Sequence, residues 1–135
     1  MKITHWAWLL VFPGIAAAHV DLKEIKFNDP AFSACVHKVA QKNNWHHSSD
    51  VTRLKCHSMA ISSAEEVTLF TNLTHLSLYN NKLSRLDLTK LDKLQELNLA
   101  NNKLQTLNIH GLARLKKLFL FRNRLKTVDL QGLAE

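Results

Sequence analysis

The sequence predicts a mainly β solenoid, of the α+β class, with an amino-terminal helical cap and no recognisable carboxy-terminal cap. Three consecutive blocks of 21 residues, 73–93, 94–114 and 115–135, carry apolar residues at the same places. A fixed period of this length indicates one short unit stacked on copies of itself. Upstream of the blocks, an apolar pattern at helical spacing and two cysteines predict the cap.

Each block carries the pattern L-x-x-L-x-L-x-x-N-x-L, as in Leu94, Leu97, Leu99, Asn102 and Leu104. The two leucines of L-x-L point to one side of a short strand, and stacking joins them into a continuous apolar column. The Asn must turn the chain out of the strand, and its amide can satisfy backbone groups that the turn leaves unpaired. We therefore predict an internal hydrogen-bonded ladder, formed by Asn81, Asn102 and Asn123.

The pattern is identified as that of leucine-rich repeats, and the second half of each block extends the resemblance. A half-copy, L-x-x-L-[DN]-[LI]-x-x-L, follows each Asn, as in residues 83–91. This nested arrangement resembles the bacterial class called IRREKO, whose pattern is LxxLxLxxNxLxxLDLxx. Asn108 and Val128 are the main departures. The resemblance implies a flattened coil with extended segments on both faces.

Residues 1–18 are predicted to be a signal peptide. Lys2 supplies a positive start, an apolar run covers residues 6–15, and three alanines at 16–18 suit a signal peptidase. An uncleaved membrane anchor is the alternative, but the apolar run is short for a membrane span. We expect cleavage after Ala18, giving a secreted or periplasmic protein that does not span the membrane.

Residues 19–50 are predicted to form the cap, with a helix over about 30–44. Asn28 or Asp29 can cap its first turn, and Pro30 suits the first helical position. Residues 51–135 are predicted to form the solenoid, in which 51–72 is a degenerate first repeat. There Cys56 takes a leucine place, and Met59 stands where the other repeats have Asn.

Cys35 and Cys56 both precede the regular repeats. Export permits a disulfide between them, which would stabilise the fold by restricting the unfolded chain. Two buried thiols or a metal pair are the alternatives, but there is no C-x-x-C, and we predict no metal site. Residues 27–61 also resemble the amino-terminal cap of secreted leucine-rich-repeat proteins of marine and enteric gammaproteobacteria. In that group a Cys of the cap helix and a Cys of the first strand are bonded, which implies the pairing Cys35–Cys56.

The outward-pointing strand residues are the candidate binding site, because solenoids recognise partners with the concave face that these residues cover. Phe119 and Phe121 lie outside the leucine ladder, and exposed aromatic side chains beside cations can anchor a partner. Packing of both rings against a further repeat is the alternative. The predicted face comprises Arg53, Lys55, His57, His75, Ser77, Tyr79, Glu96, Asn98, Ala100, Lys117, Phe119, Phe121 and Arg122.

The excess of basic residues favours an acidic partner. The chain carries 18 Lys and Arg against 11 Asp and Glu, and eleven of the basic but five of the acidic residues lie in 73–135. We expect a protein or an anionic glycan as partner. The simpler explanation is that these cations keep the coil in solution. Nucleic acid is not expected, because an exported protein rarely meets it.

No pattern indicates catalysis, so we predict a binding module without a cofactor and not an enzyme. Asp87, Asn108 and Asp129 occupy one repeating position, which is typical of a structural ladder. No Ser, Cys or carboxylate accompanies the histidines at a spacing that indicates a catalytic triad or metal hydrolase. The alternative function is a structural envelope protein without a discrete ligand. It would self-associate through its last coil, because no segment after Leu133 could cover that coil.

Overall fold

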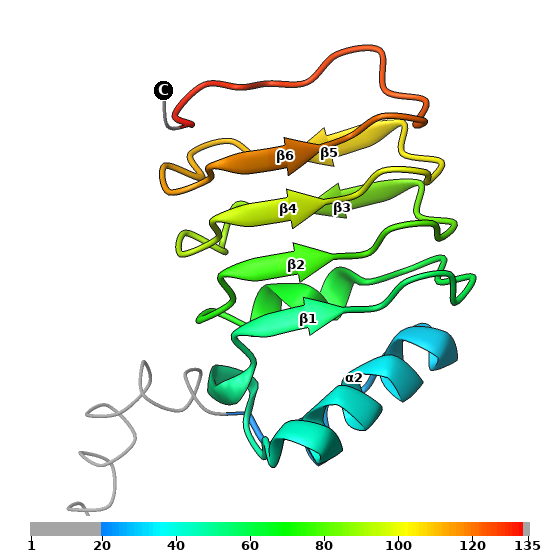
Figure 1. Cartoon of the computed structure of the whole chain (residues 1–135), viewed down its shortest axis with the longest axis vertical. Coiled ribbons are helices and arrows are strands. Elements are labelled where there is room, and N and C mark those ends of the chain that lie inside the picture. Colours follow the sequence, from blue (N-terminus) through cyan, green and yellow to red (C-terminus); the bar gives the residue numbers. More distant parts are fainter. Residues whose placement is uncertain (1–19, 134–135) are drawn as a thin grey trace, which may run out of the picture.

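The computed structural model describes residues 20–133, which form one solenoid with a helix at its amino-terminal end (Figure 1). The predicted signal peptide, residues 1–18, lies outside the described residues. Strands of successive coils stack in parallel, from the helix at one end to the last coil at the other. The predicted fold class, a mainly β coil with an amino-terminal helical cap, is confirmed.

Helix α2, Pro30–Asn43, forms the cap. Asp29 accepts hydrogen bonds from the backbone N–H groups of Ala31 and Phe32, and proline takes the first helical position, where a missing N–H costs nothing. Asn44 ends the helix in the left-handed conformation, with φ of 56°. Two short 3-10 helices flank it, η2 (Leu22–Glu24) and η3 (Ser48–Asp50).

One parallel sheet runs the length of the solenoid. Its strands, in spatial order, are β1 (Arg53–Lys55), β2 (His75–Ser77), β4 (Glu96–Asn98) and β6 (Lys117–Phe119). Each strand pairs in register with the next, so that Leu54, Leu76, Leu97 and Leu118 are successive partners. The 21-residue period therefore places equivalent residues of successive coils side by side.

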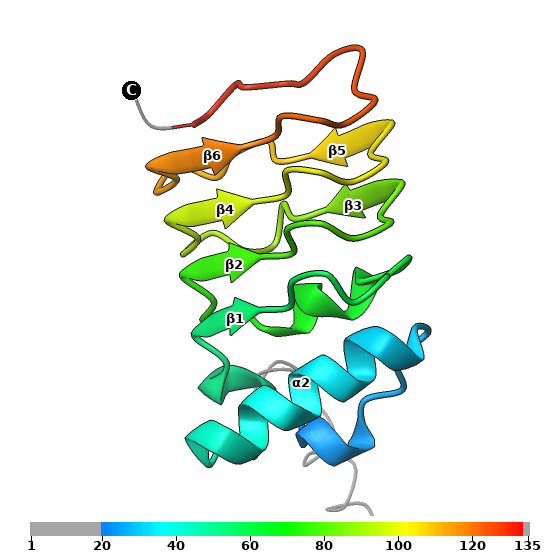
Figure 2. The ribbon, with the colours of Figure 1, turned by 45° about the vertical axis from the view of Figure 1, so that its right-hand side comes forward.

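A second, two-stranded sheet lies on the other side of the coil and contains β3 (Arg85–Asp87) and β5 (Thr106–Asn108) (Figure 2). These strands come from the half-copies of the repeat, so two coils carry extended segments on both faces. The first coil differs, because the 3-10 helix η4 (Glu65–Leu69) occupies the equivalent place. That coil lacks the L-x-x-L-D-L half-copy, which explains the difference.

The repeated leucines form the core of the first three coils. Leu54, Leu76 and Leu97 are at most 2 % exposed, because each contacts apolar side chains of its own and of neighbouring coils. In the last coil Leu118 is only half-buried, and Leu130 is 57 % exposed. Within residues 20–133 only one coil packs against this last one, so its apolar side chains contact protein on one side.

The three ladder asparagines lie where the chain leaves each strand of the long sheet. Asn102, which is 8 % exposed, accepts from the backbone N–H of Leu83 and donates to the carbonyl groups of Leu78, Leu99 and Ala100. Asn81 and Asn123 make equivalent bonds. Each amide therefore joins its own turn to the preceding coil.

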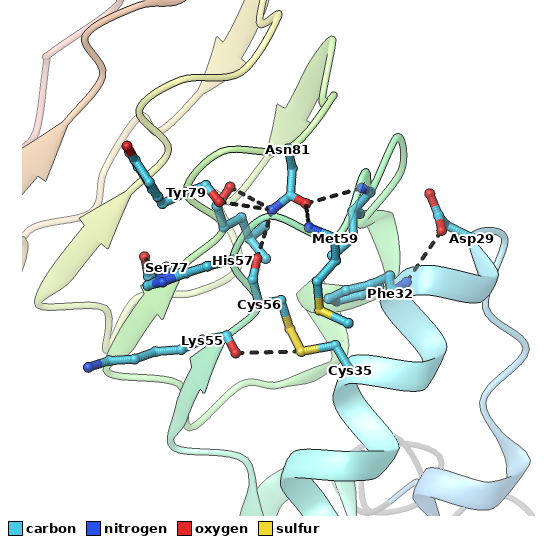
Figure 3. The surroundings of a disulfide bond; sticks show 12 residues. Asp29, Phe32, Cys35, Lys55, Cys56, His57, Met59, Ser77, Tyr79 and Asn81 are labelled. Atoms are coloured by element: carbon cyan, nitrogen blue, oxygen red, sulfur yellow. Dashed lines mark hydrogen bonds between the residues drawn. A yellow bond between two sulfur atoms is a disulfide. The ribbon is translucent and has the colours of Figure 1, made fainter.

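As predicted, a disulfide joins Cys35 of α2 to Cys56, the residue that directly follows β1 (Figure 3). A carboxylate makes a second connection, because Asp29 also accepts from the N–H groups of Ser62 (2.7 Å) and Ser63 (3.1 Å) in the first coil. Burial raises the pKa of the Asp29 carboxyl, but its four backbone N–H donors hold that pKa below the ordinary value of 3.8. The cap is thus bonded to the solenoid at both points.

Candidate functional site

The solvent side of the long sheet, which we call the sheet face, presents three columns of side chains. The register aligns Arg53, His75, Glu96 and Lys117 in the first column and Lys55, Ser77, Asn98 and Phe119 in the second. The third column lies just beyond the carboxyl ends of the strands and contains His57, Tyr79, Ala100 and Phe121. Figure 3 shows Lys55 and Tyr79 on the side of the sheet away from the disulfide. The structure therefore brings most of the predicted face together on one surface.

The first column is a connected polar network. Arg53 donates to His75 Nε2 at 2.8 Å, and His75 Nδ1 lies 2.8 Å from the hydroxyl of Thr74. Glu96 lies 2.8 Å from the Lys117 ammonium and 3.8 Å from His75 Nε2. The hydrogen bond from Lys117 is the main cause that holds the pKa of the Glu96 carboxyl below its ordinary value. This carboxylate is already neutralised by side chains of the same face.

The third column begins with a histidine that packs on a tyrosine. His57 Nε2 lies 2.6 Å from the Ser77 hydroxyl, and its ring meets the Tyr79 ring edge-on at 5.8 Å. Burial lowers the pKa of His57, and the nearby Lys55 lowers it further, so this imidazole is neutral at pH 7. It therefore offers a ring face and hydrogen bonding but no charge.

Ala100 was predicted to be part of the open face that a partner contacts, and this prediction is wrong, because the residue is fully buried. Its methyl group is too short to reach past Tyr79 and Phe121, the equivalent residues of the neighbouring coils. Side-chain size therefore decides which residues of the column a partner can touch.

The aromatic residues of the last coil are exposed. Phe119 is 45 % and Phe121 is 56 % exposed. Arg122 follows on the turn in the left-handed conformation, with φ of 56°, as Asn80 and Asn101 do in the earlier coils. It therefore lies beyond the strand, at the edge of the face.

A groove of about 790 Å³ covers the sheet face from α2 to Phe119. Its floor includes residues of β1, β2, β4 and β6 that the sequence assigned to the candidate binding face. Its amino-terminal wall is formed by residues of the cap that the sequence did not assign to the site: Val39, Lys42, Asn43 and Trp45. Nothing in the repeat pattern indicates this wall, because it depends on how α2 packs at the end of the sheet.

The opposite sheet bears a smaller hollow of about 550 Å³. Its carboxylates have structural partners. Asp87 accepts from the N–H and hydroxyl groups of Thr89, and Arg85 pairs with Glu65 at 3.1 Å. Asn108 and Asp129 accept from the backbone two residues onward, as Asp87 does. The recurring acidic or amide residue of the half-copy thus closes a turn.

Residues 20–133 contain neither a metal-binding cluster nor a membrane-spanning helix. No three or more His, Cys, Asp or Glu side chains come together there as a metal-binding group. None of the helices in this part of the chain has the length and apolar character of a membrane span.

Comparison with known proteins identifies the repeats. Residues 71–112, which cover almost all of the second and third coils, match the family described as leucine-rich repeats, in two copies. A search of curated proteins found no match. The family match and the stacked parallel coils together support a leucine-rich-repeat protein.

Proposed function

We propose that this protein is an exported binding module that holds a partner protein in the groove of the sheet face. Leucine-rich repeats are interaction scaffolds, and side chains on the strands of such solenoids contact partners. The observation that carries the proposal is the open groove of about 790 Å³, which has the exposed Phe119 at one end. Phe121, in the same coil, is exposed beyond the lining of the groove. Aromatic anchors of this kind dominate many protein interfaces.

The anchor is tested by changing Phe119 and Phe121 together to Ala. The variant is expected to lose most of its crosslinking to envelope proteins, while its melting temperature stays close to that of the wild type because both side chains are exposed. Leu69→Ala, on the other side of the coil and 37 % exposed, is the matched control. Unchanged crosslinking by the double variant would contradict the proposal.

An anionic glycan is a second candidate partner. Aromatic rings stack on sugars, and Arg or Lys side chains pair with their acidic groups. Phe119 lies beside Lys117 on β6, which favours this candidate. Binding to a sulfated polysaccharide column that is retained in about 0.15 M salt would support it.

A structural role through self-association is the alternative function. Leu130 is 57 % exposed, and β6 has no strand on its outer edge within residues 20–133. Light scattering at micromolar concentration separates the two roles. If Phe119→Ala with Phe121→Ala abolishes oligomers and leaves crosslinking to other proteins unchanged, the structural role replaces the binding role.

Export is also part of the proposal, and the buried disulfide supports it, because disulfides persist in oxidising compartments. Mass spectrometry of the protein from culture medium or periplasm should give a mature chain that begins at His19. Recovery of the intact chain only from the cytoplasm would contradict export.

A further inference from the structure

The amino-terminal end of the groove holds three cations that have no carboxylate partner. Lys42 comes from α2, and Arg53 and Lys55 come from β1, and all three line the groove. Within residues 20–133 none of them lies within 4 Å of an acidic side chain; the ion pairs formed there involve other basic residues. Arg53 is near enough to Glu96 to lower the pKa of that carboxyl, but none of the three cations forms an ion pair with it, so this end of the groove carries an excess of positive charge.

The backbone segments that carry the two lysines are bonded to each other. The Cys35–Cys56 disulfide bonds the helix of Lys42 to the chain that follows Lys55, and Cys35 Sγ lies 3.5 Å from the Lys55 carbonyl oxygen (Figure 3). Arg53 is oriented by His75. A backbone that is fixed before binding loses less conformational freedom when a ligand binds.

The rest of the groove has a different character. Its single carboxylate, Glu96, is already paired with Lys117. Ser77 and Asn98 offer uncharged hydrogen bonding along the middle column, and Phe119 offers an exposed ring at the far end. Cations without an ion-pair partner thus lie at one end of the groove, and the exposed apolar ring lies at the other, where Lys117 is paired with Glu96.

We propose that the occupant of the groove is an extended acidic segment of a partner protein, with its carboxylates at Lys42, Arg53 and Lys55 and an apolar side chain on Phe119. This inference rests on the proposed function. A polyanionic glycan carries charge along its whole length and would place some of it against Glu96 and the phenylalanine. A peptide can carry its charges at one end alone.

The spacing of the strands sets the distance between the cations of β1 and Phe119 of β6, and therefore the distance between the ligand groups that they bind. Three steps separate β1 from β6, and neighbouring strands lie about 4.8 Å apart, so the cations and Phe119 are roughly 14 Å apart. An extended chain advances about 3.3 Å per residue. The acidic residues and the apolar residue of the segment are therefore about four positions apart.

The test uses fluorescence anisotropy with labelled synthetic peptides and the purified chain beginning at His19. The first peptide has two glutamates, an uncharged spacer, and a leucine four positions after the second glutamate. In the second peptide the leucine directly follows the glutamates. We expect the first to bind at least about tenfold more tightly, and more weakly as salt is raised, because charge pairing at an exposed groove is screened.

Two charge-reversal variants locate the binding. Lys42→Glu with Lys55→Glu should weaken binding of the first peptide by at least about tenfold. Lys82→Glu with Lys103→Glu changes the net charge equally on exposed residues outside the groove and should have little effect. Circular dichroism verifies that both variants fold.

Three outcomes would overturn the inference: equal binding of both peptides, equal weakening by both variants, or tight binding of a sulfated polysaccharide without binding of the acidic peptide. If the peptides fail while Phe119→Ala with Phe121→Ala still abolishes crosslinking to a partner, the proposed function stands and only the acidic segment is wrong. If the crosslinking is insensitive as well, the groove is not the binding site.

Discussion

The amide of a single asparagine connects two coils of this solenoid. Asn102 makes one accepted and three donated hydrogen bonds, all to backbone groups, and is nearly inaccessible to solvent. Removal of the amide would leave these backbone groups without partners inside the protein. A buried polar group without a partner costs about 1–3 kcal/mol.

Asn102→Ala is therefore expected to lower the free energy of unfolding by about 2–4 kcal/mol, since more than one backbone group loses its partner. Urea denaturation followed by circular dichroism measures the change. Asn108→Ala is the control, because that side chain is exposed, and its bonds to the backbone N–H of His110 (3.3 Å) and to the Asp87 carboxylate lie at the surface. Equal losses in the two variants would show that the ladder position has no special role.

The lowered pKa of the Asp29 carboxyl predicts how the free energy of unfolding depends on pH. Its folded pKa lies below the ordinary value, so the carboxylate stabilises the fold above the unfolded pKa of about 4. This contribution is lost as pH falls through the folded pKa. Asp29→Asn should be less stable at pH 7 and lose less stability between about pH 5 and pH 2.

Unfolding by urea at a series of pH values checks this prediction. Asp92→Asn, an exposed residue of a later coil, serves as the control. If the pH dependence of Asp29→Asn matches that of the wild type, the acid sensitivity comes from other carboxyl groups. Asp50 and Asp87, whose pKa values are also lowered by backbone hydrogen bonds, are the next candidates.

At the scale of elements, helix α2 closes the end of the solenoid that the first coil would otherwise expose. It buries Phe32, Cys35, Val36 and Ala40. Hydrophobic burial holds the helix on the coil, and the disulfide limits the freedom of the unfolded chain. The helix also supplies one wall of the groove, so its attachment affects the binding site as well as stability.

Replacement of Cys35 and Cys56 together by Ser should lower the free energy of unfolding by about 3 kcal/mol, because the bond closes a loop with a sequence separation of 21. Thermal unfolding of the double variant against the wild type measures the loss. Both cysteines are at most 4 % exposed, so mild reductant should leave the folded wild type unchanged. A rapid loss of stability in dilute reductant would contradict this burial.

Across the whole molecule, burial declines toward the last described coil. Leu97 lies between two coils and is fully buried, whereas its register partner Leu118 is half-buried. A solenoid is stabilised by interfaces between neighbours, so a residue that contacts one neighbour contributes less than a residue that contacts two.

Leu97→Ala should therefore lower the free energy of unfolding by about 3–5 kcal/mol, the range for fully buried leucines. Leu118→Ala should lower it clearly less, and urea denaturation measures both changes. Hydrogen exchange should show the same gradient, with faster exchange in β6 than in β2. Equal costs for the two substitutions would mean that the last coil is packed on both sides in solution.

The repeat pattern was sufficient to predict the stacked coils and the leucines that are buried in the first three of them. A 21-residue period with apolar residues in phase leaves few other ways to bury them, so local pattern and overall fold agree. The bounds of α2 were also predictable from local residues, because Asp29 and Pro30 favour a helix start and the polar residues after Ala40 favour its end. These features depend on contacts between residues with matching positions in the repeat.

The wall formed by Lys42 and Trp45, the burial of Ala100 and the pairing of Glu96 with Lys117 were not predictable in this way. Each depends on which side chains from distant segments meet, and on their sizes. The periodic pattern thus determined the scaffold and its outward columns, whereas packing of the non-repeating cap against the first coil decided the shape and charge of the groove. Periodicity constrains only residues that recur, and the cap occurs once.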